Sequence, residues 1–237
     1  STGTMSFFGD LTVARNAIAS VQNTVRGIFA GGRVSPARFN VMDFITTASK
    51  GNATTFGVLT AAVQFAVGGC SNSVRGLYHL GTSTWSPVWN SLNQVDSITL
   101  ASTGDTTEFG TLSSGRYQGG GSGGASSTRG FFFGGLVSGQ PAGTKIIESV
   151  SFTSGGAATK FGELTVGRRA IAAVTNNTRA VACSGDLADG AINVMDYITM
   201  ASEGNATDFG DTIGLDLNGA SVQNRTRGVM MGTETPS

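Results

Sequence analysis

The sequence predicts an all-β protein built as a five-bladed β-propeller, with the fifth blade shared between the N- and C-terminal segments. The first observation is an internal repeat: residues 40–57 recur at 193–210 with 14 of 18 positions identical, and weaker copies occupy 94–110 and 146–162. A fixed period of about 50 residues indicates a repeat architecture. The second observation is composition, because 36 glycines against 4 prolines suit short strands joined by tight turns.

Two short markers divide the chain into five modules of one domain, residues 1–237. Phe-Gly pairs begin at residues 8, 56, 109, 161 and 209, in steps of 48, 53, 52 and 48 residues. An arginine follows a polar turn in every module, at positions 26, 75, 129, 179 and 227. The predicted modules are 13–60, 61–113, 114–165 and 166–212, with a fifth made of 213–237 and 1–12.

Each module is expected to form four strands. In the first module these are a small apolar strand at 16–22, a second at 26–32 and a third at 41–49. The fourth strand is the Phe-Gly-x-Leu segment, as in 8–12. An Asn-containing turn joins the first two strands, because asparagine tolerates left-handed backbone geometry.

The third strand supplies the third observation. Along it, Val41 and Ile45 point to one face, while Met42 and Phe44 point to the other. A strand that is apolar on both faces lies in a sheet covered on both sides. Four-stranded sheets that pack face to face around an axis form a propeller.

The fifth module lacks a third strand in this sequence. Aligning Phe8 with Phe56 sets Ser1 against Ser49, and Ser237 follows a second strand. We expect an unpaired edge that invites a strand from another protein. The alternative is that segments 1–6 and 233–237 pair with each other and fill the gap.

Composition argues against several classes of function. Fifteen basic residues balance 15 acidic ones, so no electrostatic footprint for nucleic acid or an anionic membrane is present. No apolar run reaches the 18 or so residues of a spanning helix, and no signal peptide is recognised. Cys70 and Cys183 occupy non-equivalent positions, which predicts two buried free thiols.

The charged residues that recur are expected to be structural. Catalytic acids have no reason to recur in every blade, so the acids are predicted to cap strand ends or pair with arginine. The recurring arginines are predicted to bind backbone carbonyls or carboxylates between blades. The positions are Asp43, Asp96, Glu148 and Asp196 for the acids and Arg26, Arg75, Arg129, Arg179 and Arg227 for the arginines.

No catalytic residue, metal site or cofactor is predicted, and the protein is not expected to be an enzyme. The single histidine, His79, aligns with Ala30, Phe133, Cys183 and Met231, which are packing residues. One imidazole cannot furnish the usual transition-metal site. A Ser-His-Asp triad also lacks support, since no Gly-x-Ser-x-Gly elbow lies near it.

Residues that differ between modules are the candidates for binding. Trp85 and Trp89 lie in the longest connection between a second and a third strand, 81–94, and Tyr78 precedes that connection. Arg33 and Arg38 lie on the equivalent loop of the first module. Exposed aromatics on such loops are typical anchors for protein partners or sugars. The alternative is that the tryptophans fold back over their own blade.

The order of arginine, small strand, turn and Gly-Gly strand resembles the kelch motif, with its glycine doublet at Gly31-Gly32 and Gly134-Gly135. The amino-acid sequence of residues 8–15 and 198–210 is similar to the repeats of virion structural proteins in tailed phages of marine cyanobacteria. This resemblance covers nearly the whole chain. It implies a kelch-like propeller in a phage virion, associated with the tail or a fibre, whose partners are other virion proteins. The alternative is a lectin-like propeller that binds host-surface carbohydrate.

Overall fold

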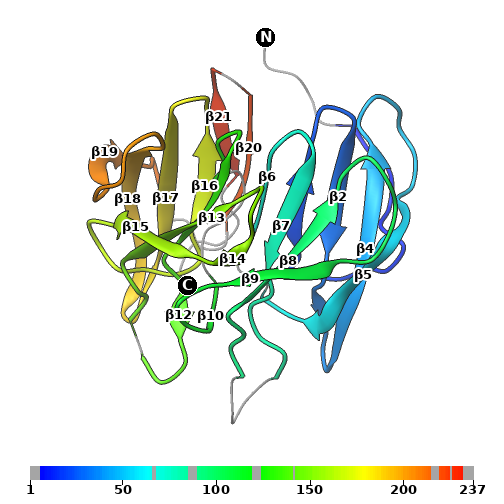
Figure 1. Cartoon of the computed structure of the whole chain (residues 1–237), viewed down its shortest axis with the longest axis horizontal. Helices are drawn as coiled ribbons and strands as arrows, with labels where there is room; N and C mark the ends of the chain where they lie inside the picture. Colours follow the sequence, from blue (N-terminus) through cyan, green and yellow to red (C-terminus); the bar gives the residue numbers. More distant parts are fainter. Residues whose placement is uncertain are drawn as a thin grey trace.

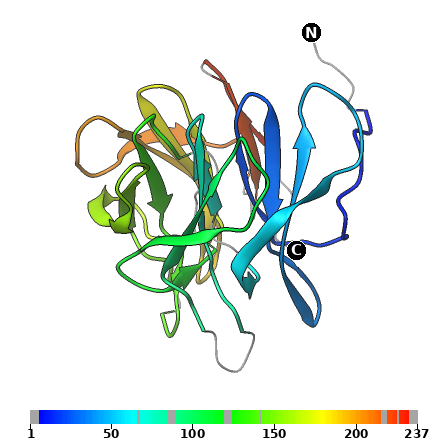
Figure 2. The ribbon, with the colours of Figure 1, turned by 45° about the vertical axis from the view of Figure 1, so that its right-hand side comes forward.

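The computed structural model describes residues 6–65, 68–84, 90–118, 124–140, 142–214, 219–224 and 226–231. These residues form strands and turns without any helix, and the strands build four blades of a β-propeller (Figures 1 and 2). The predictions of an all-β chain and of a propeller are therefore confirmed.

The first two blades have the predicted antiparallel order of four strands, each running from the first strand of the module to the fourth. Blade 1 contains β1 (Ala19–Gln22), β2 (Arg26–Ala30), β4 (Ala37–Thr46) and β5 (Thr54–Val63), with β3 (Arg33–Val34) added beside β4. Blade 2 contains β6 (Gly68–Ser71), β7 (Arg75–His79), β8 (Gln94–Thr99) and β9 (Thr107–Thr111).

The next two blades follow the same plan with local variation. Blade 3 contains β11 (Arg129–Phe133), β13 (Ile146–Ser151) and β15 (Thr159–Glu163); near it lie β10 (Arg116–Tyr117), β12 (Leu136–Val137) and β14 (Gly156–Ala157). Among the described residues before β11, Ala125 forms an antiparallel bridge with Gly130. Blade 4 contains β16 (Ala172–Thr175), β17 (Arg179–Leu187), β18 (Gly190–Thr199) and β19 (Thr207–Asp211).

A two-stranded sheet, called the fifth sheet below, follows blade 4. It consists of β20 (Ala220–Gln223) and β21 (Gly228–Met231). Its turn is built like the turns of the blades: the Asn224 Oδ1 atom accepts hydrogen bonds from the backbone N–H groups of Thr226 and Arg227, both at 2.8 Å. The Asn23 side chain does the same for Val25 and Arg26 in blade 1. This side-chain capping explains why Asn precedes Arg by three residues in the repeat.

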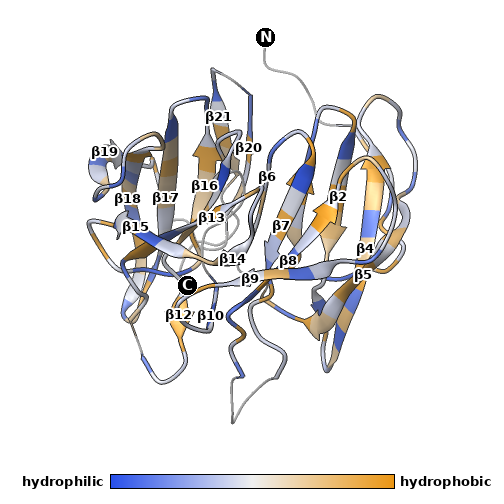
Figure 3. Ribbon diagram, in the orientation of Figure 1, coloured by the Kyte–Doolittle hydropathy of each residue, from blue (hydrophilic) through white to orange (hydrophobic). Residues whose placement is uncertain are grey.

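The core consists of apolar layers between neighbouring blades, and hydrophobic residues lie mainly along the strands (Figure 3). Between blades 1 and 2, Ile28 and Ala30 of β2 share one buried cluster with Tyr78 and Leu100. Between blades 3 and 4, Phe131 and other side chains form an equivalent cluster. The third strand is therefore covered on both faces, as its sequence pattern predicts.

A parallel backbone joint links the fourth strands of blades 1 and 3 to the next blade. The N–H group of Gly104 donates to the Phe56 carbonyl, and that of Gly204 donates to the Phe161 carbonyl, both at 2.9 Å. The N–H group of Gly51 donates in the same way to the Phe8 carbonyl at 2.9 Å. Residues 8–10 therefore lie against blade 1 as the fourth strand of a preceding blade would.

The fifth sheet packs on blade 4 but leaves its other face open. Val21 of β1 is 3% exposed because blade 2 covers it, whereas the equivalent Val222 is 50% exposed. A Cβ atom added at Gly228 would meet Val174 of blade 4, while one added at Gly27 would meet only side chains of its own blade. Among the described residues, blade 1 and the fifth sheet therefore do not pack as the complete blades do.

Candidate functional site

The recurring acids are completely buried, and each of the four carboxylates accepts a hydrogen bond from a residue at the end of the preceding module. In the first such cluster, the Asp43 carboxylate accepts hydrogen bonds from Arg15 Nη1 at 2.8 Å and from the Thr12 hydroxyl at 2.6 Å. Blade 4 repeats the arrangement: the Asp196 carboxylate accepts from Arg168 Nη1 at 2.7 Å and from the Thr165 hydroxyl at 2.5 Å.

Blades 2 and 3 show two variants of this cluster. In blade 3, Glu148 pairs with Arg116 at 2.6 Å. In blade 2, neutral groups donate to the Asp96 carboxylate: the amide of Gln94 at 2.7 Å, the hydroxyl of Thr106 at 2.5 Å and the hydroxyl of Thr60 at 2.8 Å. A buried carboxylate needs donors to offset its lost hydration. These clusters join each blade to the end of the preceding module and bury the four recurring carboxylates.

The arginine partners of the acids are not those that the sequence analysis selected. They are Arg15, Arg116 and Arg168, each seven residues after the first residue of a Phe-Gly pair. That spacing recurs in three modules and could have revealed them.

Three of the five arginines selected from the sequence instead contact the backbone of the following blade. Arg26 Nη1 donates to the carbonyls of Leu100 at 3.1 Å and Ala101 at 2.8 Å, and Arg129 Nη2 donates to the Met200 carbonyl at 2.9 Å. Arg75 donates to the equivalent carbonyl of Phe152. These are inter-blade carbonyl contacts of the kind expected for this position. The Arg179 guanidinium lies 4.5 Å from the centre of the Tyr197 ring, and Arg227 lines the pocket described below.

His79 lies in the core between blades 2 and 3. Its ring is fully buried, packs edge-on against Phe132 and has Nε2 2.9 Å from the Leu92 carbonyl. Burial, with a smaller effect of the Arg116 cation, lowers the pKa of His79 to about 3. The ring is therefore neutral at physiological pH and enclosed by packing side chains.

The predicted loop site is only partly described. Trp85 and Trp89 lie outside the described residues. Tyr78 is fully buried between blades 1 and 2, where its hydroxyl donates to the Ile28 carbonyl at 3.4 Å, so it belongs to the core and not to a binding surface. Arg33 and Arg38 are cross-strand neighbours on the β3–β4 hairpin, and the Arg33 guanidinium stacks 4.7 Å from the Phe65 ring.

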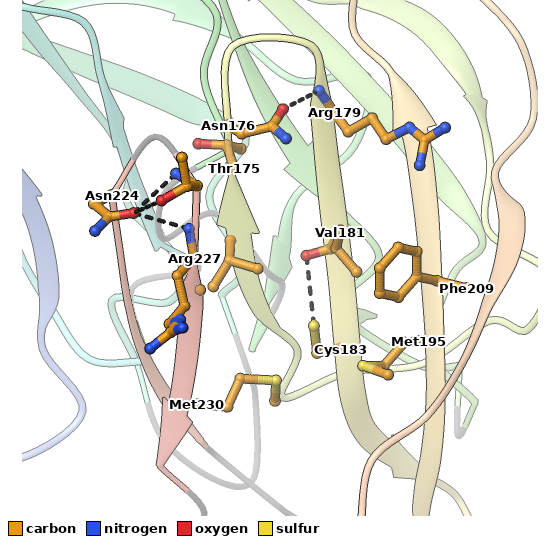
Figure 4. A pocket seen from close by; sticks show the side chains of 13 residues that line it. Thr175, Asn176, Arg179, Val181, Cys183, Met195, Phe209, Asn224, Arg227 and Met230 are labelled. Carbon is orange, nitrogen blue, oxygen red and sulfur yellow. Dashed lines mark hydrogen bonds between the residues drawn. The ribbon is translucent and has the colours of Figure 1, made fainter. Parts of the chain in front are cut away.

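A pocket of about 440 Å³ lies between blade 4 and the fifth sheet. Cys183, Met195 and Phe209 of blade 4 face this space, with Met230 of β21 opposite them (Figure 4). Burial raises the pKa of the Cys183 thiol to about 11, so the thiol is protonated and a weak nucleophile at neutral pH. Cys183 therefore contributes apolar contact to the pocket rather than a thiolate.

The pocket occupies the position where a third strand would pack. Phe56 and Phe161 are each 3% exposed because the next blade covers them, but the equivalent Phe209 is 51% exposed. Within the described ranges, β21 pairs only with β20, whereas β2, β7 and β17 each pair on both sides. We call the surface of β21 together with Met195 and Phe209 the open flank.

Comparison with known proteins gives no match to any family model or to any curated protein. In the described part of the chain, no helix long and apolar enough to cross a membrane is found. The same ranges contain no group of three or more His, Cys, Asp and Glu residues placed to hold a metal ion.

Proposed function

We propose that the protein is a non-enzymatic structural component of a phage virion, associated with the tail or a fibre, which acts through contacts with other virion proteins. The observation that carries the proposal is the sequence of the repeat at residues 8–15 and 198–210, which is similar to repeat sequences in virion proteins of cyanobacterial tailed phages.

The chemistry of the described residues supports this proposal. The acids that recur in the modules are engaged in inter-blade clusters, and His79 is neutral and enclosed. A particle component needs a rigid surface for partners, which inter-blade ion pairs and stacked apolar layers provide. The function then resides in surfaces rather than in a reactive centre.

We also propose that the complete ring has five kelch-like blades. Two features support it: β20 and β21 pair with the turn and register of the first two strands of a blade, and residues 8–10 lie where a preceding fourth strand would. The fifth blade would then combine both ends of the chain.

The test is the composition of the particle. Density-purified virions of a cyanobacterial phage that encodes this sequence should contain the protein at a fixed copy number by quantitative mass spectrometry. Antibody labelling should then locate it on the tail or its fibres. Finding the protein only in the soluble fraction of the lysate would contradict the proposal.

The lectin alternative depends on the tryptophans of the 81–94 connection. A glycan array separates it from the structural proposal. Saturable binding of a host glycan that is lost in Trp85→Ala and retained in Val34→Ala, a change in the neighbouring hairpin, would favour the lectin.

A further inference from the structure

We propose that the open flank binds one β-strand from another virion protein, and that this strand has the third-strand pattern of the present repeat with an uncharged residue in place of its acid. The assignment of the donor to the particle rests on the proposed function. The chemistry of the strand is derived from the structure alone.

The complete junction between blades 3 and 4 shows what the strand must supply. There, Ile198 and Met200 of blade 4 pack in one cluster with Phe131 and Phe161 of blade 3. Arg129 also donates to the Met200 carbonyl at 2.9 Å. At the open flank, Phe209 and Arg179 hold the positions of Phe161 and Arg129. The incoming strand therefore needs two apolar residues, two positions apart, that face blade 4.

The backbone of β21 fixes the direction and register of this strand. In blade 4, β17 pairs antiparallel with β18, and Ala180 lies opposite Ile198. Gly228 holds the position of Ala180 in the repeat, so it should lie opposite the first of the two apolar residues. A strand added to a sheet edge gains main-chain hydrogen bonds, and its alternate side chains determine specificity.

Ile213 determines which type of residue the incoming strand can carry in place of the recurring acid. The Thr212 N–H group donates to the Asn193 carbonyl at 2.8 Å, as Leu164 N–H does to Lys145, which places Ile213 in the position of Thr165. Thr165 donates a hydroxyl to the buried Asp196 carboxylate. Ile213 cannot donate, and its side chain is fully exposed. A carboxylate buried against it would lose hydration without gaining that bond.

Two peptides test the proposal on the full chain. Both copy residues 193–205 with a lysine pair added at each end, and one of them carries Asp196→Val. Isothermal titration calorimetry should show one site for the valine peptide, with affinity at least about tenfold higher than for the aspartate peptide, since tenfold is about 1.4 kcal/mol. Hydrogen exchange at 228–231 should slow only when the valine peptide is bound.

Variants of exposed residues separate recognition from folding. Phe209→Asp should abolish binding, and Ile213→Thr should reduce the preference for valine over aspartate by restoring the hydroxyl. Thr212→Ser, a neighbouring change that keeps its hydrogen bond, should leave both affinities unchanged. The absence of saturable binding, or equal affinity for the two peptides, would overturn the proposal. So would self-association of the protein through the flank, which would make a second copy the occupant.

The outcomes also distinguish this inference from the proposed function. Failure of peptide binding to a protein that is present in virions would refute the strand and leave the virion assignment intact. Binding by a protein that is absent from virions would refute the assignment and leave the chemistry of the strand intact.

Discussion

Arg168 and Asp196 show how one buried ion pair can attach the segment between two blades to the following blade. Both side chains are fully buried, and Arg168 also donates to the carbonyls of Ser184 at 2.8 Å and Ala182 at 3.1 Å. The pair therefore links the segment before blade 4 to the second and third strands of that blade.

Removing one partner of this pair should be strongly destabilising. We expect Asp196→Ala to lower the free energy of unfolding by about 3–5 kcal/mol, because it leaves the Arg168 charge buried without a counter-charge. Chemical denaturation followed by circular dichroism measures the loss. The matched control is Glu163→Gln in the exposed pair with Lys160, which should leave the midpoint nearly unchanged. Similar effects for the two variants would contradict this account of the buried pair.

His79 should make the protein less stable in acid. Its pKa is about 3 in the folded state against 6.5 for an ordinary histidine, so the unfolded chain binds a proton that the folded chain does not. The stability due to its burial is complete above pH 6.5 and falls as the pH decreases toward 3, by about 1.4 kcal/mol per pH unit at most.

The comparison with His79→Phe isolates this contribution from that of the acids. Phenylalanine already occupies the equivalent position in blade 3, at Phe133. The plot of unfolding free energy against pH should be less steep for the variant between pH 6 and 4, by about one proton. Parallel plots for the two proteins would show that His79 is protonated in the folded state.

At the scale of an element, the glycine of the first four Phe-Gly pairs lets one segment approach the next blade closely. A Cβ atom at Gly162 would overlap the carbonyl oxygen of Gly204, and one at Gly57 would overlap that of Gly104. The backbone joint between blades therefore accepts no side chain at this position.

Gly162→Ala should separate blade 3 from the 204–206 segment of blade 4. We expect a loss of several kcal/mol, in the range of other substitutions that force a backbone shift in a packed core. Gly51→Ala is the control, because a Cβ there would meet nothing within 4 Å. Thermal unfolding of the two variants measures the difference, and equal midpoints would mean that the joint tolerates displacement.

The repeat made the elements predictable, but not all their partners. Asn turns and two-faced third strands depend on neighbours in sequence or on a fixed alternation, so the four-stranded blades could be read from residues such as Asn23 and Met42. Asp43 is held by Arg15, which lies before the first strand of blade 1, and by Thr12 of the preceding module. That pairing depends on how blades stack, which the pattern within one module does not contain.

The candidate site was harder to predict for the same reason. Tyr78 resembles an aromatic binding residue in sequence, but the neighbouring blade buries it. Phe209 is exposed although its sequence context matches that of buried Phe161. The difference is that a following blade covers Phe161, whereas no described blade covers Phe209. The available signal was its position beside the fifth module, for which the sequence analysis expects an unpaired edge.

At the scale of the whole molecule, stability should decrease from the four blades toward the fifth sheet. Each layer between blades buries apolar side chains from two sheets, and such layers separate blades 1, 2, 3 and 4. The fifth sheet has blade 4 on one face, while Val229 and Met231 on its other face are 48% and 41% exposed. Fewer buried contacts and an edge without a described partner favour local opening.

Hydrogen exchange followed by mass spectrometry can measure this gradient in the isolated chain. Residues 180–183 lie in β17, whose backbone pairs on both sides, and should exchange at a rate close to that of global unfolding. Residues 228–231 lie in β21, which has only β20 as a described partner, and should exchange at least about a hundredfold faster. The two segments hold equivalent positions in the repeat, so the comparison is matched for type of strand. Equal protection would mean that the fifth sheet is already completed within the isolated chain, and the open flank would then have no place for an incoming strand.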